Sequence, residues 1–177
     1  PGVSARVFGA LGDRGISVTM ISQSSSESSI CIAGPRTDAL AAEIARIRAA
    51  HGYCLLLDVH SIRAHVPRLF EGRLPDLNIG TDNGATCHPA IEAAVANACA
   101  DGPYSHVVNG RFRGGWTTRH YGRPDCKIHA IQMEIAQSTY LEAEEPPFAY
   151  SPDKAASLRD TLAAVFGGIQ STFGDLA

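Results

Sequence analysis

Two side chains capable of chemistry stand at the end of a short apolar run. Residues 55–57 are all Leu, and Asp58 and His60 follow them. This pattern predicts a buried strand that ends at the carboxyl edge of a sheet, where open α/β folds bind ligands. Side chains two apart on a strand share a face. We therefore expect His60 to be a metal ligand, and Asp58 either to bind the same metal or to orient the His60 ring. A plainer interpretation fits equally well: Asp58 caps the next turn and His60 packs at the edge.

A further carboxylate lies in a second apolar segment. Residues 128–135 alternate strongly and predict a strand near the centre of the sheet, on which Gln132 and Glu134 share one face. Burying a carboxylate without a partner is unfavourable. Desolvation would raise the pKa of Glu134 and suit it to act as a general base, whereas a neighbouring metal ion or arginine would lower that pKa. Both directions remain open.

The third candidate stretch, residues 109–123, holds four arginines, an asparagine and a histidine among several glycines. Glycine lets the backbone approach a ligand closely, and the arginine guanidinium binds carboxylates through two parallel hydrogen bonds. In a chain with a formal net charge of −3, this concentration of arginine predicts recognition of a small acidic substrate. The alternative is a basic surface loop paired with acidic groups elsewhere. No phosphate-binding glycine motif is present, so no nucleotide is predicted.

The elements expected to position these groups are those of an α/β domain. Helices are predicted at about residues 38–50, 89–100 and 153–166, and strands at about residues 55–60, 106–108 and 128–135. Between them, residues 61–89 form a long irregular segment, which indicates a functional loop. The expected fold is a mostly parallel, mixed sheet of roughly six strands with helices on both faces. The chain after residue 166 is expected to fray.

The beginning of the sequence follows a different pattern. A helical stripe in residues 3–13 precedes a strand at 16–21, a serine-rich turn and a second strand at 30–33. The runs PGVSARVF and ISQSSSESSI resemble the ACT module of aspartate kinases, in which the Pro-Gly turn helps to form an amino-acid effector site. The module's first strand has no counterpart here, and a packing element with a solvated turn is the plainer interpretation. We place the domain boundary near Pro35, giving domains 1–35 and 36–177.

Composition narrows the class of protein. A chain of 177 residues suits one domain with a small appendage, and its slightly acidic balance argues against nucleic acid or an anionic membrane as partner. No apolar run approaches the roughly 20 residues that span a bilayer, and no signal-peptide pattern occurs, so we expect a cytoplasmic protein. Five cysteines without a CxxC spacing predict free thiols rather than disulfides. Formation of a homo-oligomer remains open.

Residues from about 37 to 168 resemble the N-formylglutamate amidohydrolase family. The runs that carry the resemblance are LLLDVHSIR, VPRLFEGRLPDLNIGT, NGRFRGGWTTRHYGRP and IHAIQMEIAQSTY. It implies a fold similar to zinc carboxypeptidases and aspartoacylase, and a zinc-dependent hydrolase of histidine degradation that converts N-formylglutamate to glutamate and formate. It also implies a zinc ligand at His60 beside Asp58, and a catalytic Glu134 that activates metal-bound water. The residues implied to bind the substrate are Asn109, Arg111, Arg119 and His120.

One part of the family's sequence pattern is absent from this sequence. The family's amino-terminal half supplies a His in a PHSG-like turn and an acidic ligand in a DTDW-like run, and this sequence contains neither. Because a catalytic zinc usually takes three protein ligands, we expect an incomplete site unless His65 or His88 contributes. The sequence therefore resembles a fusion of two families. Two alternatives to a hydrolase follow: a module that binds a dicarboxylate or amino acid without catalysis, and a purely structural chimera.

Overall fold

The computed structural model describes residues 20–23, 30–33 and 37–176, with side chains described for residues 40–172. The chain divides into two compact units, Pro1–Glu43 and Ile44–Ala177. The predicted helix in residues 3–13 and the predicted junction at Pro35 lie outside the described residues.

In the first unit, β1 (Met20–Gln23) pairs antiparallel with β2 (Ile30–Ala33). The strand predicted at 30–33 is confirmed, and the one predicted at 16–21 overlaps β1. Helix α2 (Thr37–His51) follows and extends across the division between the units. Arg48, in its last turn, donates from Nε to the backbone oxygen of Cys126 at 2.6 Å.

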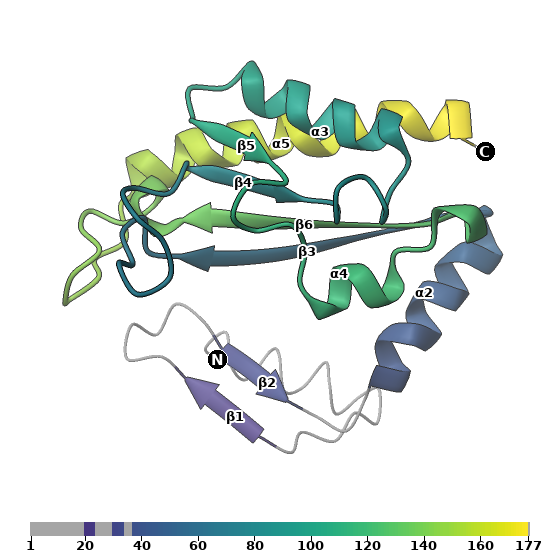
Figure 1. Ribbon diagram of the computed structural model, residues 1–177, viewed down its shortest axis with the longest axis horizontal. Coiled ribbons are helices and arrows are strands. Elements are labelled where there is room, and N and C mark those ends of the chain that lie inside the picture. The colour runs from purple at the N-terminus through teal and green to yellow at the C-terminus, as the bar shows by residue number, and fades with distance from the viewer. Residues whose placement is uncertain (1–19, 24–29, 34–36, 177) are drawn as a thin grey trace. The chain divides into compact units, whose positions relative to one another are not determined.

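The second unit is built on a four-stranded mixed sheet with the order β3-β6-β4-β5 (Figure 1). The strands are β3 (Cys54–Ile62), β4 (Leu77–Gly80), β5 (His106–Val108) and β6 (Ile128–Ala136). β3 runs parallel to β6, β4 runs antiparallel to β6, and β5 runs parallel to β4. The expected count of about six is wrong for the described residues, because β1 and β2 pair with each other in a separate sheet.

Helices cover both faces of this sheet, as expected. Helices α3 (Pro89–Ala100) and α5 (Pro152–Leu176) lie together on one face, and the short α4 (Trp116–Tyr121) lies against β6 on the other (Figure 1). Two 3₁₀ turns, η1 (Pro124–Cys126) and η2 (Gln137–Thr139), flank β6.

Helix α5 ends ten residues beyond the position that the sequence pattern predicts, and the prediction of a frayed tail after residue 166 is wrong. Two glycines at 167 and 168 suggested a stop signal. Instead, a β carbon on Gly168 would lie 3.3 Å from the backbone oxygen of Ala94 in α3. The following residue, Ile169, is only 3% exposed. Gly168 therefore allows the two helices to approach closely, and burial of Ile169 extends the helix beyond it.

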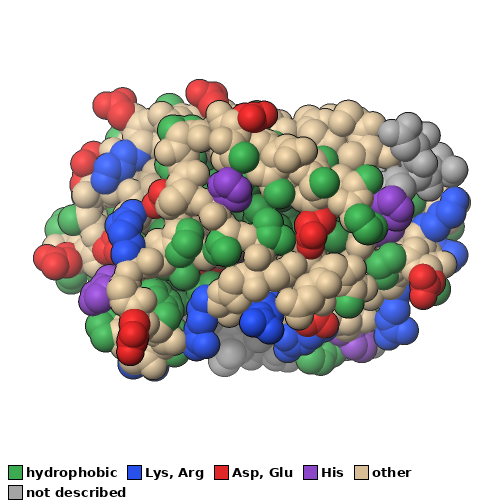
Figure 2. Space-filling view, turned by 45° about the horizontal axis from the view of Figure 1, so that its top comes forward, with side chains coloured by type: hydrophobic (Ala, Val, Ile, Leu, Met, Phe, Trp, Pro, Cys, Tyr) green, Lys and Arg blue, Asp and Glu red, His purple; other side chains and the backbone are tan. Residues whose placement is uncertain are grey.

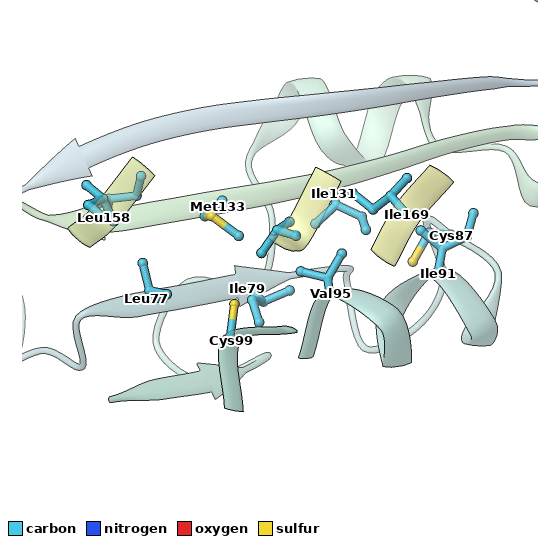
Figure 3. Close-up of a cluster of buried hydrophobic side chains, with 12 residues drawn as sticks. Leu77, Ile79, Cys87, Ile91, Val95, Cys99, Ile131, Met133, Leu158 and Ile169 are labelled. Atoms are coloured by element: carbon cyan, nitrogen blue, oxygen red, sulfur yellow. The ribbon is translucent and has the colours of Figure 1, made fainter. Parts of the chain in front are cut away.

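The main core lies between the sheet and the pair α3 and α5 (Figure 3). Its fully buried members include Leu77, Ile79, Ile91, Val95, Ile131 and Met133. Cys87 and Cys99 belong to this cluster as thiols, and burial, aided by nearby Glu92, raises the pKa of Cys87 to about 12. A thiol with such a pKa stays protonated and unreactive at neutral pH.

The surface carries charges of both signs. Figure 2 shows acidic and basic side chains spread over one face of the molecule, with apolar side chains between them. No helix in the described part of the chain is both long and apolar enough to cross a membrane.

Gly80→Ala tests how closely the arginine-rich loop approaches the sheet. A β carbon at position 80 would lie 2.5 Å from the nitrogen of Gly114 and 2.6 Å from the carbonyl carbon of Arg113. Because backbone atoms cannot yield easily, we expect the free energy of unfolding in urea to fall by about 1–3 kcal/mol. Gly167→Ala is the matched control: it has nothing within 4 Å, and alanine should stabilise the helix by about 0.5–1 kcal/mol. Wild-type stability for Gly80→Ala would contradict this close approach.

Candidate functional site

Four even-numbered residues, Asp58 and His60 of β3 and Gln132 and Glu134 of β6, form a polar row on the face of the sheet opposite the main core. Their parallel register places His60 beside Glu134 and Asp58 beside Gln132. The antiparallel partner of Glu134 on the other side is Asn78 of β4. The odd-numbered residues of β6 take the apolar face, so alternation alone directs these polar side chains to one surface. The register agrees with the two sequence-based expectations that Asp58 shares a face with His60 and that Gln132 shares a face with Glu134, and it brings the two pairs side by side.

Asp58 and His60 contact each other directly. The distance from Nε2 of His60 to Oδ1 of Asp58 is 2.8 Å, and the side chain of His60 is 51% exposed whereas that of Asp58 is 18% exposed. The carboxylate can therefore fix the orientation and tautomer of the imidazole, as carboxylates do for histidines in metal and catalytic sites. The imidazole remains open to a ligand.

Glu134 is the buried acid of the site, with 7% of its surface exposed. Burial raises its pKa, nearby Asp58 acts in the same direction, and His60 opposes them. Of the two directions that the sequence left open, the structure favours the upward one, which moves a carboxyl group toward the range in which it both accepts and releases a proton near neutral pH.

Asn78 is an additional polar residue beside Glu134 that the sequence analysis did not identify. It is 1% exposed, and its Nδ2 donates to the backbone oxygens of Pro75 (2.8 Å) and Glu134 (3.2 Å). Its Oδ1 is buried without a hydrogen-bond partner among the described residues. Asn78 thereby ties the backbone of Glu134 to β4. A lone Asn in the run LNIG carries no sequence signal for this role.

The donor types of Asp58 and His60, a carboxylate and an imidazole, suit zinc. In the described part of the chain, however, no group of three or more His, Cys, Asp or Glu side chains could hold a metal ion. His65 contacts the backbone oxygen of Gly72 through Nδ1, and His88 accepts a hydrogen bond from the nitrogen of Ala90 at the start of α3. The described residues therefore do not complete a three-ligand zinc site.

The arginine-rich loop is held in place by Asn109, which lies at a positive φ of 53°. Its Oδ1 accepts from the backbone nitrogens of Thr81 (2.9 Å) and Asn83 (3.2 Å). Its Nδ2 donates to Thr81 Oγ1 (2.7 Å) and to Glu92 Oε2 (3.2 Å). The amide of Asn109 therefore connects the end of β5 to β4 and α3. A sequence reading cannot find this network, because its members are far apart in the chain.

The rest of the loop is attached to the strand that carries Glu134. The nitrogen of Gly115 donates to Oε1 of Gln132 at 2.5 Å, and Nη1 of Arg119 donates to the backbone oxygen of Gly114 at 2.6 Å. Arg111 and Arg119 are both exposed. These two bonds engage the backbone of the loop, and the Arg111 guanidinium remains at the surface.

His120 belongs to a small aromatic cluster on α4. Its ring stacks on Trp116 with centroids 4.1 Å apart and an interplanar angle of 14°, and it meets Tyr121 edge-on at 4.8 Å. Trp116 itself is 56% exposed. The stacking fixes the His120 ring, and the exposed indole is a further aromatic surface that the sequence analysis did not single out.

Together, an α/β fold, a paired carboxylate and imidazole, and a buried acid of raised pKa define a candidate hydrolytic site beside an arginine-rich loop. Residues 35–141 match the family model described as N-formylglutamate amidohydrolase, and residues 1–45 match an ACT domain model. The chain belongs to the N-formylglutamate amidohydrolase family.

Two curated relatives agree with this assignment, and a solved structure shares the fold. The N-formylglutamate deformylase of Pseudomonas aeruginosa is 54% identical over 124 residues, which cover 70% of this chain and 46% of that protein. The N-formylglutamate deformylase of Pseudomonas putida is 53% identical over 122 residues, covering 68% and 45%. The crystal structure of N-formylglutamate amidohydrolase from Ralstonia eutropha has a similar fold, with a TM-score of 0.65, 24% identity, and coverage of 73% of this chain and 48% of that one. This chain spans about half the length of each.

Glu134→Gln should make the folded protein more stable than the wild type, by a margin that grows as the pH rises. A raised pKa means that the folded state binds the proton of Glu134 more tightly than the unfolded chain does. The wild type therefore loses stability between the ordinary pKa near 4.5 and the raised one, whereas the neutral glutamine does not titrate. Urea unfolding over an acid-to-neutral pH series measures the difference, with Glu145→Gln at an exposed site as control. A margin that stays constant with pH would contradict a raised pKa.

Proposed function

We propose that this chain acts in the hydrolysis of N-formyl-L-glutamate to L-glutamate and formate. The observation that carries the proposal is the position of Glu134, a buried carboxyl group of raised pKa paired in register with His60. The names of the two Pseudomonas relatives support the choice of substrate. The proposal applies their activity to a chain that spans about half of their length.

In this proposal Glu134 transfers a proton from water to the leaving amine. Its carboxylate takes a proton from a water molecule as the water oxygen adds to the formyl carbon. When the carbon–nitrogen bond breaks, the protonated Glu134 returns that proton to the departing amine nitrogen. Formate and the free amino group of glutamate result. A group that must both accept and donate works best with a pKa raised toward the operating pH, and burial shifts Glu134 in that direction.

We further propose that His60 and Asp58 are two of the three protein ligands that a catalytic zinc takes. Such an ion, when bound, would polarise the formyl carbonyl. Elemental analysis of protein purified without chelator tests the assignment. Because the described residues provide only this pair, we expect weak zinc binding that His60→Ala removes, and equal zinc in the two proteins would contradict it.

The substrate's two carboxylates suit the arginines of the 109–123 loop. Arg111 and Arg119 can each offer a carboxylate two parallel N–H donors, and both lie at the surface. His120 is oriented by its stacking on Trp116, and Asn109 shapes the loop that carries them. In the proposed complex the arginines hold the glutamate part of the substrate, so that its formyl group lies toward β6.

Glu134→Gln separates catalysis from binding. The amide keeps the size of the side chain but cannot accept the proton, so we expect turnover of N-formylglutamate to fall by about 10²–10⁴-fold. Calorimetric affinity for the substrate should change little. Trace activity that is unchanged by the substitution would refute the role of Glu134.

Arg111→Ala should weaken binding of N-formylglutamate by roughly 10- to 100-fold, because a charge-assisted hydrogen bond contributes about 1.5–3 kcal/mol. Titration calorimetry measures the affinity, and the folded state should be unaffected since Arg111 is exposed. Arg159→Ala, at an exposed position on α5, is the matched control and should bind as the wild type does. Equal affinities for the two variants would exclude Arg111 from the substrate site.

A second candidate function is binding of a dicarboxylate or amino acid without catalysis. The observation in its favour is that the described residues contain no three-ligand metal group. Wild-type protein that binds N-formylglutamate through Arg111 but shows no turnover at any zinc concentration would support this candidate over hydrolysis.

A further inference from the structure

The sheet of the second unit has two very different edges. At one edge, β5 has only three residues. At the other, β3 has nine, and it pairs with β6 without interruption from Cys54 to Ile62. Within the part of the chain that the structure describes, β6 is the strand that pairs with β3, and no other described segment hydrogen-bonds to the backbone of residues 55–62. A row of backbone donors and acceptors therefore faces outward along β3.

Exposed edges of this length are usually protected, because they recruit other strands. Natural proteins shorten such edges, bulge them, cover them, or place Pro, Lys or other charged side chains on them. β5 is protected by its shortness. β3 is long, its sequence CLLLDVHSI contains neither Lys nor Pro, its register shows no bulge, and its one acidic side chain, Asp58, is paired with His60. The strand has the features of an interior strand at the position of an edge.

The side chains of β3 support the same conclusion. Val59 aligns with Met133, so its side chain is on the apolar face of the sheet, yet it is 51% exposed. Met133 is fully buried at 0%. Leu55 and Leu57, on the same face, are only partly buried against the core cluster. The apolar face thus continues onto β3 beyond the area that α3 and α5 cover.

We propose that the outer edge of β3, to which no described segment is hydrogen-bonded, is an interface for a β-strand from the part of the N-formylglutamate amidohydrolase fold that this chain does not span. The chain covers 46% of the Pseudomonas aeruginosa relative and 48% of the Ralstonia eutropha structure, so about half of each has no counterpart here. The added strand would place apolar residues beside Val59 on one face and polar residues beside Asp58 and His60 on the other. The interface is independent of whether the proposed hydrolysis occurs.

The test supplies that missing part as a separate polypeptide. A tagged segment containing the residues of the Pseudomonas aeruginosa deformylase that have no match here is co-expressed with the full 177-residue chain, or refolded together with it. We expect a one-to-one complex by light scattering. In that complex, hydrogen exchange should slow at least tenfold, relative to the chain alone, at those amides of residues 55–62 whose N–H groups point away from β6, because these groups become bonded.

Two matched substitutions identify the edge. Val59→Lys puts a charge on the half-exposed edge position and should weaken the complex at least tenfold without unfolding the chain. Phe166→Lys changes a side chain on α5 that is 50% exposed and should leave the affinity unchanged.

Four results would overturn the proposal. They are no complex under either condition, a complex without protection of residues 55–62, equal effects of the two substitutions, and a homodimer of this chain that already protects β3. All these readouts measure binding, so a chain without turnover can still confirm the interface, and an active chain can still refute it.

Discussion

The parallel pairing of β3 with β6 is the constraint on which the rest of the site depends. It runs over nine residues, and its register decides which side chains face the helices and which face the arginine-rich loop. Shifting it by one residue would bring Val59 or Ser61 beside Glu134 in place of His60 and would move polar groups into the apolar layer. The packing of Ile131 and Met133 against α3 and α5, on the opposite face of the sheet, therefore fixes the positions of His60 and Glu134.

The loop that carries the arginines is held by the Asn109 side chain and by its own backbone, while the Arg111 guanidinium remains at the surface. Asn109 connects it to Thr81 and Glu92, Gln132 binds the nitrogen of Gly115, and the Arg119 side chain returns to the oxygen of Gly114. Because amide groups make most of these bonds, the guanidinium of Arg111 stays available to a ligand. The loop and the buried acid also share β6 as a common support.

The sequence predicted most of the elements, because periodicity is a local signal. The strands at β3, β5 and β6 and the helix at α3 follow from runs of apolar residues, and the shared face of Asp58 and His60 follows from alternation. β4 was missed, since its four residues LNIG are too few to show a period. The end of α5 was misplaced because Gly167 and Gly168 resemble a stop signal, and the helix contact at Gly168 is visible only in three dimensions. The polar network around Asn109 lacked any local signal for the same reason.

Gly80 allows the backbone of the arginine-rich loop to lie directly against strand β4. The backbone of β4 and the backbone at residues 113 and 114 are so close that no side chain fits between them. A protein that places a guanidinium-bearing loop over its sheet in this way needs a residue without a β carbon at this point of the strand. In any other member of the family, the identity of the residue aligned with Gly80 therefore indicates whether this loop can follow the same path.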